Sequence, residues 1–447
     1  MLLLMITMMV SMMVQSTPMT ASLPNHQALT PNKRTLVLLD EPLLQHSSSK
    51  YFEALTSAGY KLKFKKLGEA SQVTLKDNGE FEYDNVIIFM QGKQNPTDRS
   101  TGNLLEFIDA GGNVLMATTG QSKWARDFAF ENGIKIGEIP VFDRFPPSEG
   151  ARLAVPWPKG EQNFFLGTPP PSAATALIRY SGIPAEPNTD AVGFGAVRVL
   201  SAPMTAYQPK SAISGTKIGL ITSVQMRNNA RVTISGSISQ FEDVNFGSNG
   251  VFNERLTKWT FADASVLRVK SWEHRKSDGS HPETQIKHAR HLESNLPRSH
   301  FPDPEWGPNA KIYRIRDEVN YRMVLEISTF DGKWQPYVAN DIQIEFAMLD
   351  PYQRRTFVSE GNGRYVARFM LPDQYGTFAF RVVYNRPGVS RLRVLDSVNV
   401  RPFRHDEYER FILSAYPYYS AVGVVMVGFL LFSISFAMVR KPHTKTE

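Results

Sequence analysis

Two acidic residues follow the first predicted strand of the chain, a position at which some enzymes keep their reactive groups. Asp40 and Glu41 directly follow an apolar run at Thr35–Leu39, which is typical of a strand buried on both faces. In doubly wound sheets, ligands gather at the carboxyl ends of the strands. Two carboxylates could share acid–base work there, but such work also needs a cleft. A polar loop that ends the strand explains the pair more simply, and we favour that interpretation.

Ser122 and the glycines near residue 193 resemble two kinds of site without completing either. Ser122 lies in the run GQSKW, which lacks the final glycine of the G-x-S-x-G nucleophile turn. A serine placed just before a helical segment is typical of an N-cap, and we predict that role. The run Gly193 to Arg198 (GFGAVR) begins like a dinucleotide-binding loop, but Arg198 occupies the place of the third glycine. It therefore indicates packing rather than a cofactor site.

Most of the histidines gather in one polar stretch, residues 274–310. They are His274, His281, His288, His291 and His300. His288 and His291 are three residues apart and could place two imidazoles on one helical face, so a weak metal site stays open. In a polar loop, however, such a pair is typically solvated. Because the chain has no cysteine, thiolate ligands and cysteine nucleophiles are excluded. We predict no catalytic residue, no metal-binding residue and no cofactor.

The elements that would position these residues alternate between strand and helix over residues 33–270. Apolar strand-like runs occur at 35–39, 85–90 and 114–117, and helical patterns occur at 48–58, 101–110 and 122–131. This order predicts a parallel, doubly wound α/β domain. Prolines are dense between residues 140 and 187, which predicts an irregular surface excursion. Strand patterns at 192–199, 218–222 and 230–235 should complete the sheet, with a late helix at 252–261.

The hydrophobic period changes to two between residues 313 and 403. Ile342, Ile344 and Phe346 alternate with polar residues, and the Asp331-Gly332 pair indicates a hairpin turn. Several short strands of this kind predict an antiparallel β-sandwich. We expect residues 271–312, which separate the two domains, to form a polar loop.

The end of the chain carries a stretch long enough to cross a membrane. Residues 421–439 are almost wholly apolar, and about 20 such residues match a bilayer core of roughly 30 Å. We predict a transmembrane helix at 416–439 and a cytosolic tail at 440–447. Residues expected at the membrane interface are Tyr416, Tyr418, Tyr419, Arg440 and Lys441. Small residues that would let another helix approach are Ser420, Gly423, Gly428, Ser433 and Ser435.

The start of the chain favours secretion. Residues 1–16 (MLLLMITMMVSMMVQS) form a short apolar run before a polar, proline-containing stretch, which predicts a signal peptide. With one late span, this gives a single-pass type I protein with a lumenal body; an uncleaved anchor is the alternative. The net charge of +7 is spread along the chain, so nucleic-acid binding is not expected. The chain also lacks any Asn-x-Ser/Thr acceptor, since the triplet at Asn95 contains a proline.

Several segments together resemble the family of 48 kDa subunits of the eukaryotic oligosaccharyltransferase. The segments are Arg34–Glu41, Gly111–Gly120, Arg227–Ser237, Asn340–Pro387 and Tyr408–Tyr419. The resemblance implies a flavodoxin-like N-terminal domain without a ligand and a location in the endoplasmic reticulum membrane. It also implies a non-catalytic structural subunit of a complex that transfers a preassembled oligosaccharide from dolichyl diphosphate to asparagine during protein N-glycosylation.

The implied partners are a multi-pass catalytic subunit, a ribophorin II-like subunit, the defender-against-death subunit and membrane lipid. The tail departs from the di-lysine retrieval signal of many family members, because only Lys445 is in place. Two other functions remain as alternatives from the residues alone. One is a membrane-anchored lumenal hydrolase that uses Asp40 or Ser122, and the other is a glycan-binding module.

Overall fold

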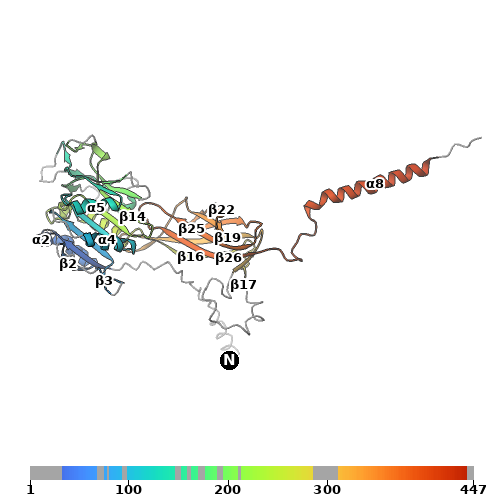
Figure 1. The fold of residues 1–447 in the computed structure, drawn as a ribbon, viewed down its shortest axis with the longest axis horizontal. Helices are drawn as coiled ribbons and strands as arrows, with labels where there is room; N and C mark the ends of the chain where they lie inside the picture. Colours follow the sequence, from blue (N-terminus) through green and yellow to red (C-terminus); the bar gives the residue numbers. More distant parts are fainter. Residues whose placement is uncertain are drawn as a thin grey trace, which may run out of the picture.

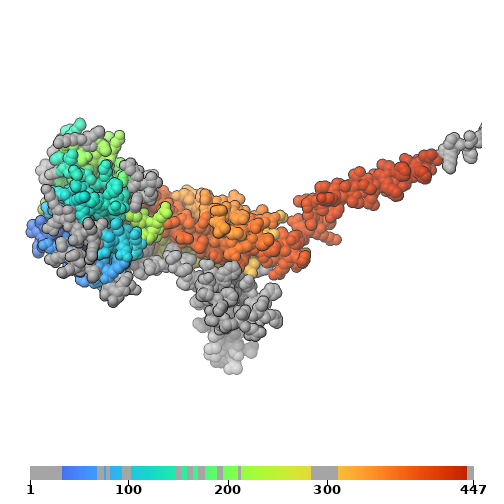
Figure 2. Space-filling view, viewed as in Figure 1, coloured from blue at the N-terminus to red at the C-terminus, as the bar shows by residue number. Residues whose placement is uncertain are grey.

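The computed structural model shows an elongated chain with three parts (Figures 1 and 2). It describes residues 33–67, 75–77, 80–92, 98–145, 153–158, 163–169, 177–188, 195–209, 213–284 and 311–439. A mixed α/β unit, built from the described residues between 33 and 260, lies at one end. A unit of strands, the β unit, continues from residue 267 to residue 401. The apolar helix α8 (Tyr416–Met438) projects from the far end of the β unit. The expected signal peptide lies outside the described residues.

A seven-stranded sheet forms the centre of the α/β unit, with the order β12-β14-β15-β6-β5-β1-β2. Its strands are β1 (Arg34–Leu39), β2 (Lys61–Lys66), β5 (Asn85–Met90), β6 (Asn113–Thr118), β12 (Ala196–Ser201), β14 (Gly219–Gln225) and β15 (Arg231–Ser235). The five strands from β15 to β2 are parallel, as predicted. Strand β14 alone among these seven runs in the opposite direction, because it is antiparallel to both of its neighbours, β12 and β15. The connection from β14 to β15 is too short for the crossover that a parallel pair needs.

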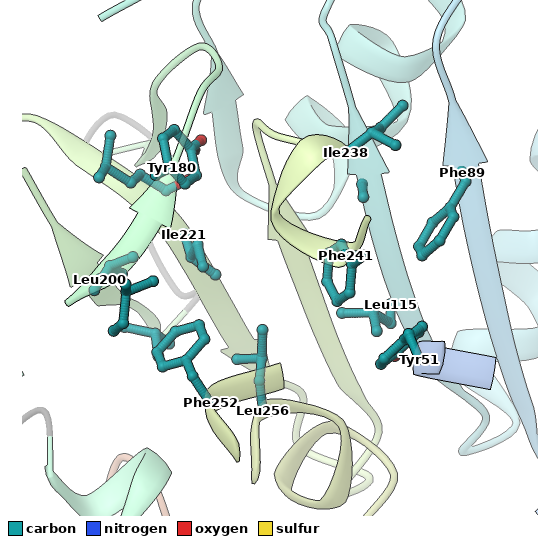
Figure 3. Close-up of a cluster of buried hydrophobic side chains, with 14 of the residues drawn as sticks. Tyr51, Phe89, Leu115, Tyr180, Leu200, Ile221, Ile238, Phe241, Phe252 and Leu256 are labelled. Atoms are coloured by element: carbon teal, nitrogen blue, oxygen red, sulfur yellow. Dashed lines mark hydrogen bonds between the residues drawn. The ribbon is translucent and has the colours of Figure 1, made fainter. Parts of the chain in front are cut away.

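Helices cover both faces of this sheet. They are α2 (Leu43–Ser47), α3 (Ser49–Ser57), α4 (Asp98–Asp109), α5 (Lys123–Glu131), α6 (Asn163–Leu166) and α7 (Phe246–Thr260). Helices α3 and α7 bury Tyr51, Phe252 and Leu256 against one face, where Leu115 of β6 and Ile221 of β14 receive them (Figure 3). Helices α4 and α5 bury a second apolar cluster on the other face.

The proline-rich region contributes to the core, so its predicted character as a surface excursion was wrong. Strand β9 (Leu153–Val155) pairs with β10 (Ile178–Tyr180), and Leu153, Trp157 and Tyr180 are buried with the α3 and α7 cluster. The prolines keep the elements short but do not prevent burial. The other short elements here are β7 (Ile134–Ile136), β8 (Phe142–Asp143), β11 (Ala185–Pro187) and β13 (Ala206–Tyr207).

Two sheets enclose the single core of the β unit. One has β16 (Leu267–Lys276), β19 (Glu318–Ser328), β20 (Trp334–Pro336), β23 (Val358–Gly361) and β24 (Arg364–Met370). The other has β17 (Glu283–Thr284), β18 (Lys311–Arg314), β21 (Gln343–Ala347), β22 (Pro351–Thr356), β25 (Gly376–Tyr384) and β26 (Leu392–Arg401). The predicted alternation is confirmed, since Ile344 and Phe346 point into a core that both sheets share. One pair, β18 with β26, is parallel.

The predicted polar loop at 271–312 was wrong at its start, because β16 extends to Lys276 and β17 follows. Strand β16 pairs with β19 along its whole length, with an irregularity between Val269 and Ser271. This bulge moves the inward-facing positions from Leu267 and Val269 to Trp272 and His274. The change of phase hides the period of two that marks a strand in the sequence.

The long strands of the β unit run from the α/β unit to the helix end (Figure 1). The far end holds the last residue of β16, β24 and β26 and the first residue of β19, which are Lys276, Met370, Arg401 and Glu318. Strand β26 has 10 residues, which corresponds to about 33 Å at the usual rise of a strand. The α/β unit is therefore held about this far from the point where the chain leaves the β unit.

Candidate functional site

Asp40 and Glu41 lie at the carboxyl end of β1, where the Asp40 carboxylate binds a backbone N–H group. Asp40 is buried, and its Oδ2 accepts a hydrogen bond from the Gly92 N–H at 2.7 Å. Its Oδ1 is buried without a partner. Glu41 is exposed. The Asp40 side chain therefore connects two strand ends, as the interpretation as a loop cap predicts.

Ser122 is the N-cap of α5, as predicted. Its Oγ accepts a hydrogen bond from the Ala125 N–H at 3.3 Å, and the serine is buried. The hydroxyl thus satisfies one of the free N–H groups of the helix start. Of the glycine-rich run, Gly193 lies outside the described residues and Arg198 lies within strand β12.

The structure describes two of the five candidate histidines, His274 and His281. His288, His291 and His300 lie outside the described residues, and His281 is exposed. His274 lies on β16 inside the β unit, where its ring is stacked on Tyr321. Within the part of the chain that the structure describes, no group of three His, Asp or Glu residues could hold a metal ion.

His274 is a buried member of a polar cluster that sequence reasoning missed. Its Nε2 lies 3.0 Å from Asp396 Oδ2 and 2.7 Å from Lys311 Nζ, and its Nδ1 contacts the Tyr313 hydroxyl. Burial lowers the pKa of His274 and outweighs the opposing effect of Asp396. Burial alone would raise the pKa of Asp396, but the hydrogen bond from His274 and the charge of Lys311 lower it to about 2. A neutral histidine beside a Lys–Asp pair leaves no net charge in this cluster.

A second buried charge, Arg231, lies where the α/β unit meets the β unit. Its Nη1 donates to the carbonyls of Trp259 and Ala264, and its Nη2 donates to the carbonyl of Ser265 at 3.0 Å. The guanidinium lies 4.6 Å from the centre of the Trp259 ring. Burial lowers the pKa of Arg231 to about 9, so it is charged at neutral pH. Arg231 thus fixes the segment between α7 and β16.

Further hydrogen bonds join the same two units, and we call this region the junction. Trp259 Nε1 donates to the Gly388 carbonyl at 2.8 Å, and Lys258 Nζ donates to the Phe330 carbonyl at 3.0 Å. The Ser390 N–H donates at 3.0 Å to the Ser265 carbonyl, which Arg231 also binds. Sequence reasoning missed the junction, although a charged residue inside the apolar run ARVTIS was a signal for Arg231.

A compact turn at residues 402–408 lies between the β unit and the apolar helix. Arg401 donates two hydrogen bonds to Glu407, at 2.6 and 2.7 Å, and the Arg404 N–H donates to the same carboxylate. These bonds lower the pKa of Glu407 to about 2. The ring of Phe403 lies between Arg314 and Tyr408. The turn therefore attaches the anchor firmly to the end of the β unit.

Helix α8 matches the predicted span closely. Residues Leu413–Met438 are the one candidate span among the described residues. Tyr416, Tyr418 and Tyr419 lie in its first turn and are exposed, whereas Arg440 and Lys441 lie outside the described residues. The helix thus begins where the tyrosines were expected to mark the membrane interface.

The small residues of α8 fall on two sides of the helix. With 3.6 residues per turn, Ser420, Gly423, Gly428 and Ser435 occupy one half, and Ser433 falls on the other. The Ser433 hydroxyl donates to the Phe429 carbonyl of its own helix. Four of the five predicted positions therefore share a surface, and Ser433 does not.

Comparison with known proteins gives one consistent family over both units. Models described as the OST48 N-terminal domain and the OST48 middle domain match residues 26–263 and 299–440. The proteins similar to this chain bear the name dolichyl-diphosphooligosaccharide–protein glycosyltransferase 48 kDa subunit. The one from Drosophila melanogaster is 33% identical over 443 residues, which covers 91% of this chain and 92% of the relative.

Two further relatives carry the same name and match over a similar length. The protein from Danio rerio is 32% identical, over 93% of this chain and 94% of its own length. The protein from Arabidopsis thaliana is 33% identical, over 90% of this chain and 92% of its own length. The similarity therefore includes the α/β unit, the β unit and the apolar helix together.

Proposed function

The chain belongs to the OST48 family, the 48 kDa subunits of oligosaccharyltransferase, and from this premise we propose that it is a non-catalytic spacer of that complex. The complex to which its relatives belong is named for glycosyl transfer from a dolichyl-diphosphate oligosaccharide to protein. Membership explains the apolar helix α8, because the substrate lipid of such an enzyme is held in a membrane. We place the protein in the endoplasmic reticulum membrane, with both folded units in the lumen.

The fixed connection between the two units is the observation that carries the spacer role. Arg231 and Ser390 both bind the Ser265 carbonyl, and Trp259 binds the Gly388 carbonyl. The turn at 402–408 ties the other end to the anchor. Buried contacts of this kind resist bending, because each broken bond would leave a polar group unsatisfied. A body of this shape can hold neighbouring subunits at a set distance from the membrane.

The contacts of the two candidate residues that a hydrolase would use support a role without catalysis. Asp40 and Ser122 both bind backbone N–H groups. The hydrolase alternative would need one of them to face a substrate.

We further propose the finer description of the fold. The parallel strand order β2-β1-β5-β6-β15 supports a flavodoxin-like domain, because that family has the order 2-1-3-4-5. Two sheets around one core support a β-sandwich. We set the boundary between the two domains within residues 261–266, ahead of β16, and keep 416–439 as the transmembrane helix and 440–447 as the cytosolic tail.

The proposed partners are other subunits of the complex, including the multi-pass catalytic subunit, the ribophorin II-like subunit and the defender-against-death subunit. The helix α8 would contact one of them through the surface that holds Gly423 and Gly428. The tyrosines of its first turn would lie at the membrane interface.

Replacement of the native subunit in living cells tests the non-catalytic role. Cells depleted of it would receive the native chain, the Asp40→Asn variant or a chain truncated before α8. Asparagine keeps an oxygen that accepts from Gly92 but removes the carboxylate. We expect Asp40→Asn to restore glycosylation of a reporter protein and the truncated chain to fail. Loss of glycosylation with normal recovery of the complex in Asp40→Asn would contradict the proposal.

A further inference from the structure

Exposed apolar side chains gather at the end of the β unit that is farthest from the junction. Leu349 is 91% exposed, Tyr375 is 64% exposed and Met370 is 58% exposed. Met348 and Tyr408 are also exposed. We call these five residues the rim. Solvent-facing apolar groups that gather at one place usually mark a surface that something covers.

The strand pairing brings the rim residues to the same end of the unit. Met348 and Leu349 form the turn from β21 to β22, and Met370 and Tyr375 flank the turn from β24 to β25. The Met348 side chain packs against Gly376, so closely that a Cβ there would lie 2.6 Å from its terminal methyl group. Since Tyr375 precedes Gly376, the two turns lie side by side.

The anchor leaves the β unit at this same end. The distance between the rim and the start of the candidate span can therefore vary little. Arg401 and Glu407 hold the chain against the β unit up to Tyr408, whose ring packs on Phe403. Only residues 409–412 separate this turn from the candidate span that begins at Leu413. The five steps of extended chain from Tyr408 to Leu413 reach at most about 18 Å. Phe411 and Ile412 are themselves apolar and exposed, so part of that length also favours the membrane.

We propose that the rim rests in the headgroup layer of the bilayer beside α8. The layer between the hydrocarbon core and water is roughly 5–8 Å thick on each side. Tyrosine and methionine side chains suit this layer, because they have an apolar body and a polar or polarizable end. Charges of both signs flank the rim, because Asp350 directly follows Leu349 and Asp373 pairs with Arg316. This mixture fits a zwitterionic surface, such as phosphatidylcholine, rather than an anionic one.

The figures agree with this placement. Helix α8 continues in the general direction of the long strands, so a bilayer crossed by α8 faces the far end of the β unit (Figure 1). The α/β unit lies at the opposite end of the molecule (Figure 2). The inference needs the membrane anchor alone and does not depend on the proposed spacer role.

The absence of cysteine from the chain allows a direct test with single labels. Leu349→Cys would carry an environment-sensitive fluorophore, in the full-length chain reconstituted into phosphatidylcholine nanodiscs. The matched control is Met204→Cys on the α/β unit, where the methionine is 86% exposed. Lipids with a nitroxide near the headgroup would serve as the quencher, and aqueous iodide would serve as the opposite probe.

We expect the nitroxide lipids to reduce emission at position 349 and to leave position 204 unchanged. Iodide should quench position 204 more strongly than position 349. Equal quenching by iodide at both positions, with no effect of the lipid quencher, would overturn the inference. So would protection of position 349 that appears only when partner subunits are present, or cross-linking of position 349 between two copies, because a protein would then cover the rim.

Discussion

Asn229 and Arg391 exchange two hydrogen bonds across the junction, although 162 positions separate them in the chain. The Arg391 N–H donates to Asn229 Oδ1 at 2.7 Å, and Asn229 Nδ2 donates to the Arg391 carbonyl at 3.2 Å. Asn229 has a φ of 71°, in the left-handed region that asparagine tolerates better than most residues. Asn229 therefore lies in the turn between β14 and β15, and its side-chain amide binds the β unit.

Replacing Asn229 by glycine should weaken the junction without straining the backbone. Asn229→Gly keeps the positive φ but loses both hydrogen bonds, so we expect a loss of about 1–3 kcal/mol. Thermal unfolding of the full-length chain in detergent would measure the change in stability, and protease cleavage within 261–266 would report opening. Asn229→Asp is the control, because it keeps the acceptor for Arg391. Equal effects of the two variants would argue against the exchange of bonds.

Arg231→Met should destabilise the chain by about 3 kcal/mol or more, because three carbonyls would lose their donor in a buried region. Arg231→Lys keeps a positive charge but cannot reach three carbonyls, so we expect an intermediate loss. The free energy of unfolding in urea would rank the three proteins. If methionine proved as stable as arginine, the guanidinium would have no role in fixing the junction.

The His274 cluster predicts that stability falls in mild acid. Because burial lowers the pKa of His274 in the folded state, the unfolded chain binds a proton more readily. Stability should therefore be complete above the unfolded pKa of about 6.5 and should decrease as the pH falls below it. Thermal unfolding at pH 7.5 and at pH 5.5 would show a lower midpoint in acid.

His274→Phe provides the control for that pH dependence. Phenylalanine keeps the ring against Tyr321 and leaves the Lys311–Asp396 pair in place. The difference between the two midpoints should then shrink. An unchanged difference would assign the acid sensitivity to other groups.

The two sides of α8 should respond differently to a bulky residue. Gly423→Leu fills the surface that four small residues share, so we expect less partner protein to be recovered with the tagged chain. Ser433→Leu lies on the other half of the helix and should leave recovery unchanged. Resistance to alkaline extraction would verify that both variants insert. Normal recovery of partner protein with Gly423→Leu would show that this surface of α8 does not bind the partners.

A single substitution can report the side of the membrane on which the β unit lies. Asp278→Asn creates an Asn-Gly-Ser triplet in an exposed turn of a chain that otherwise has no acceptor. We expect one glycan, seen as a size shift that an endoglycosidase removes. The double variant Asp278→Asn with Ser280→Ala should show no shift. Absence of the glycan in the single variant would count against a lumenal body.

The sequence predicted those strands and helices whose apolar residues keep one spacing from end to end. Strand β5 begins and ends at the predicted residues, Asn85 and Met90, because an apolar run of six residues leaves little ambiguity. Strand β16 was missed because its bulge changes the inward-facing positions halfway along. Burial of Trp157 was missed because it depends on the sheet that the segment covers, and that sheet is distant in sequence.

Residues of the candidate site also divide into those with partners near in sequence, which were predicted, and those with distant partners, which were not. Ser122 was recognised as an N-cap because capping depends on residues only a few positions away. The role of Arg231 depends on carbonyls 28 to 34 residues away, and the partners of His274 lie as far as 122 residues away. Such contacts require the fold, and a sequence indicates only that a charged residue stands in an apolar run.

The long strands of the β unit set a fixed distance between its two ends. Every long strand of the β unit extends from the junction to the rim, so two extra residues in one strand alone would break its pairing with the neighbours. They would not lift the α/β unit by the expected 6–7 Å. The height of that unit above the lipid can change only when all strands lengthen together, and a fixed height suits a protein that must meet the same neighbours each time.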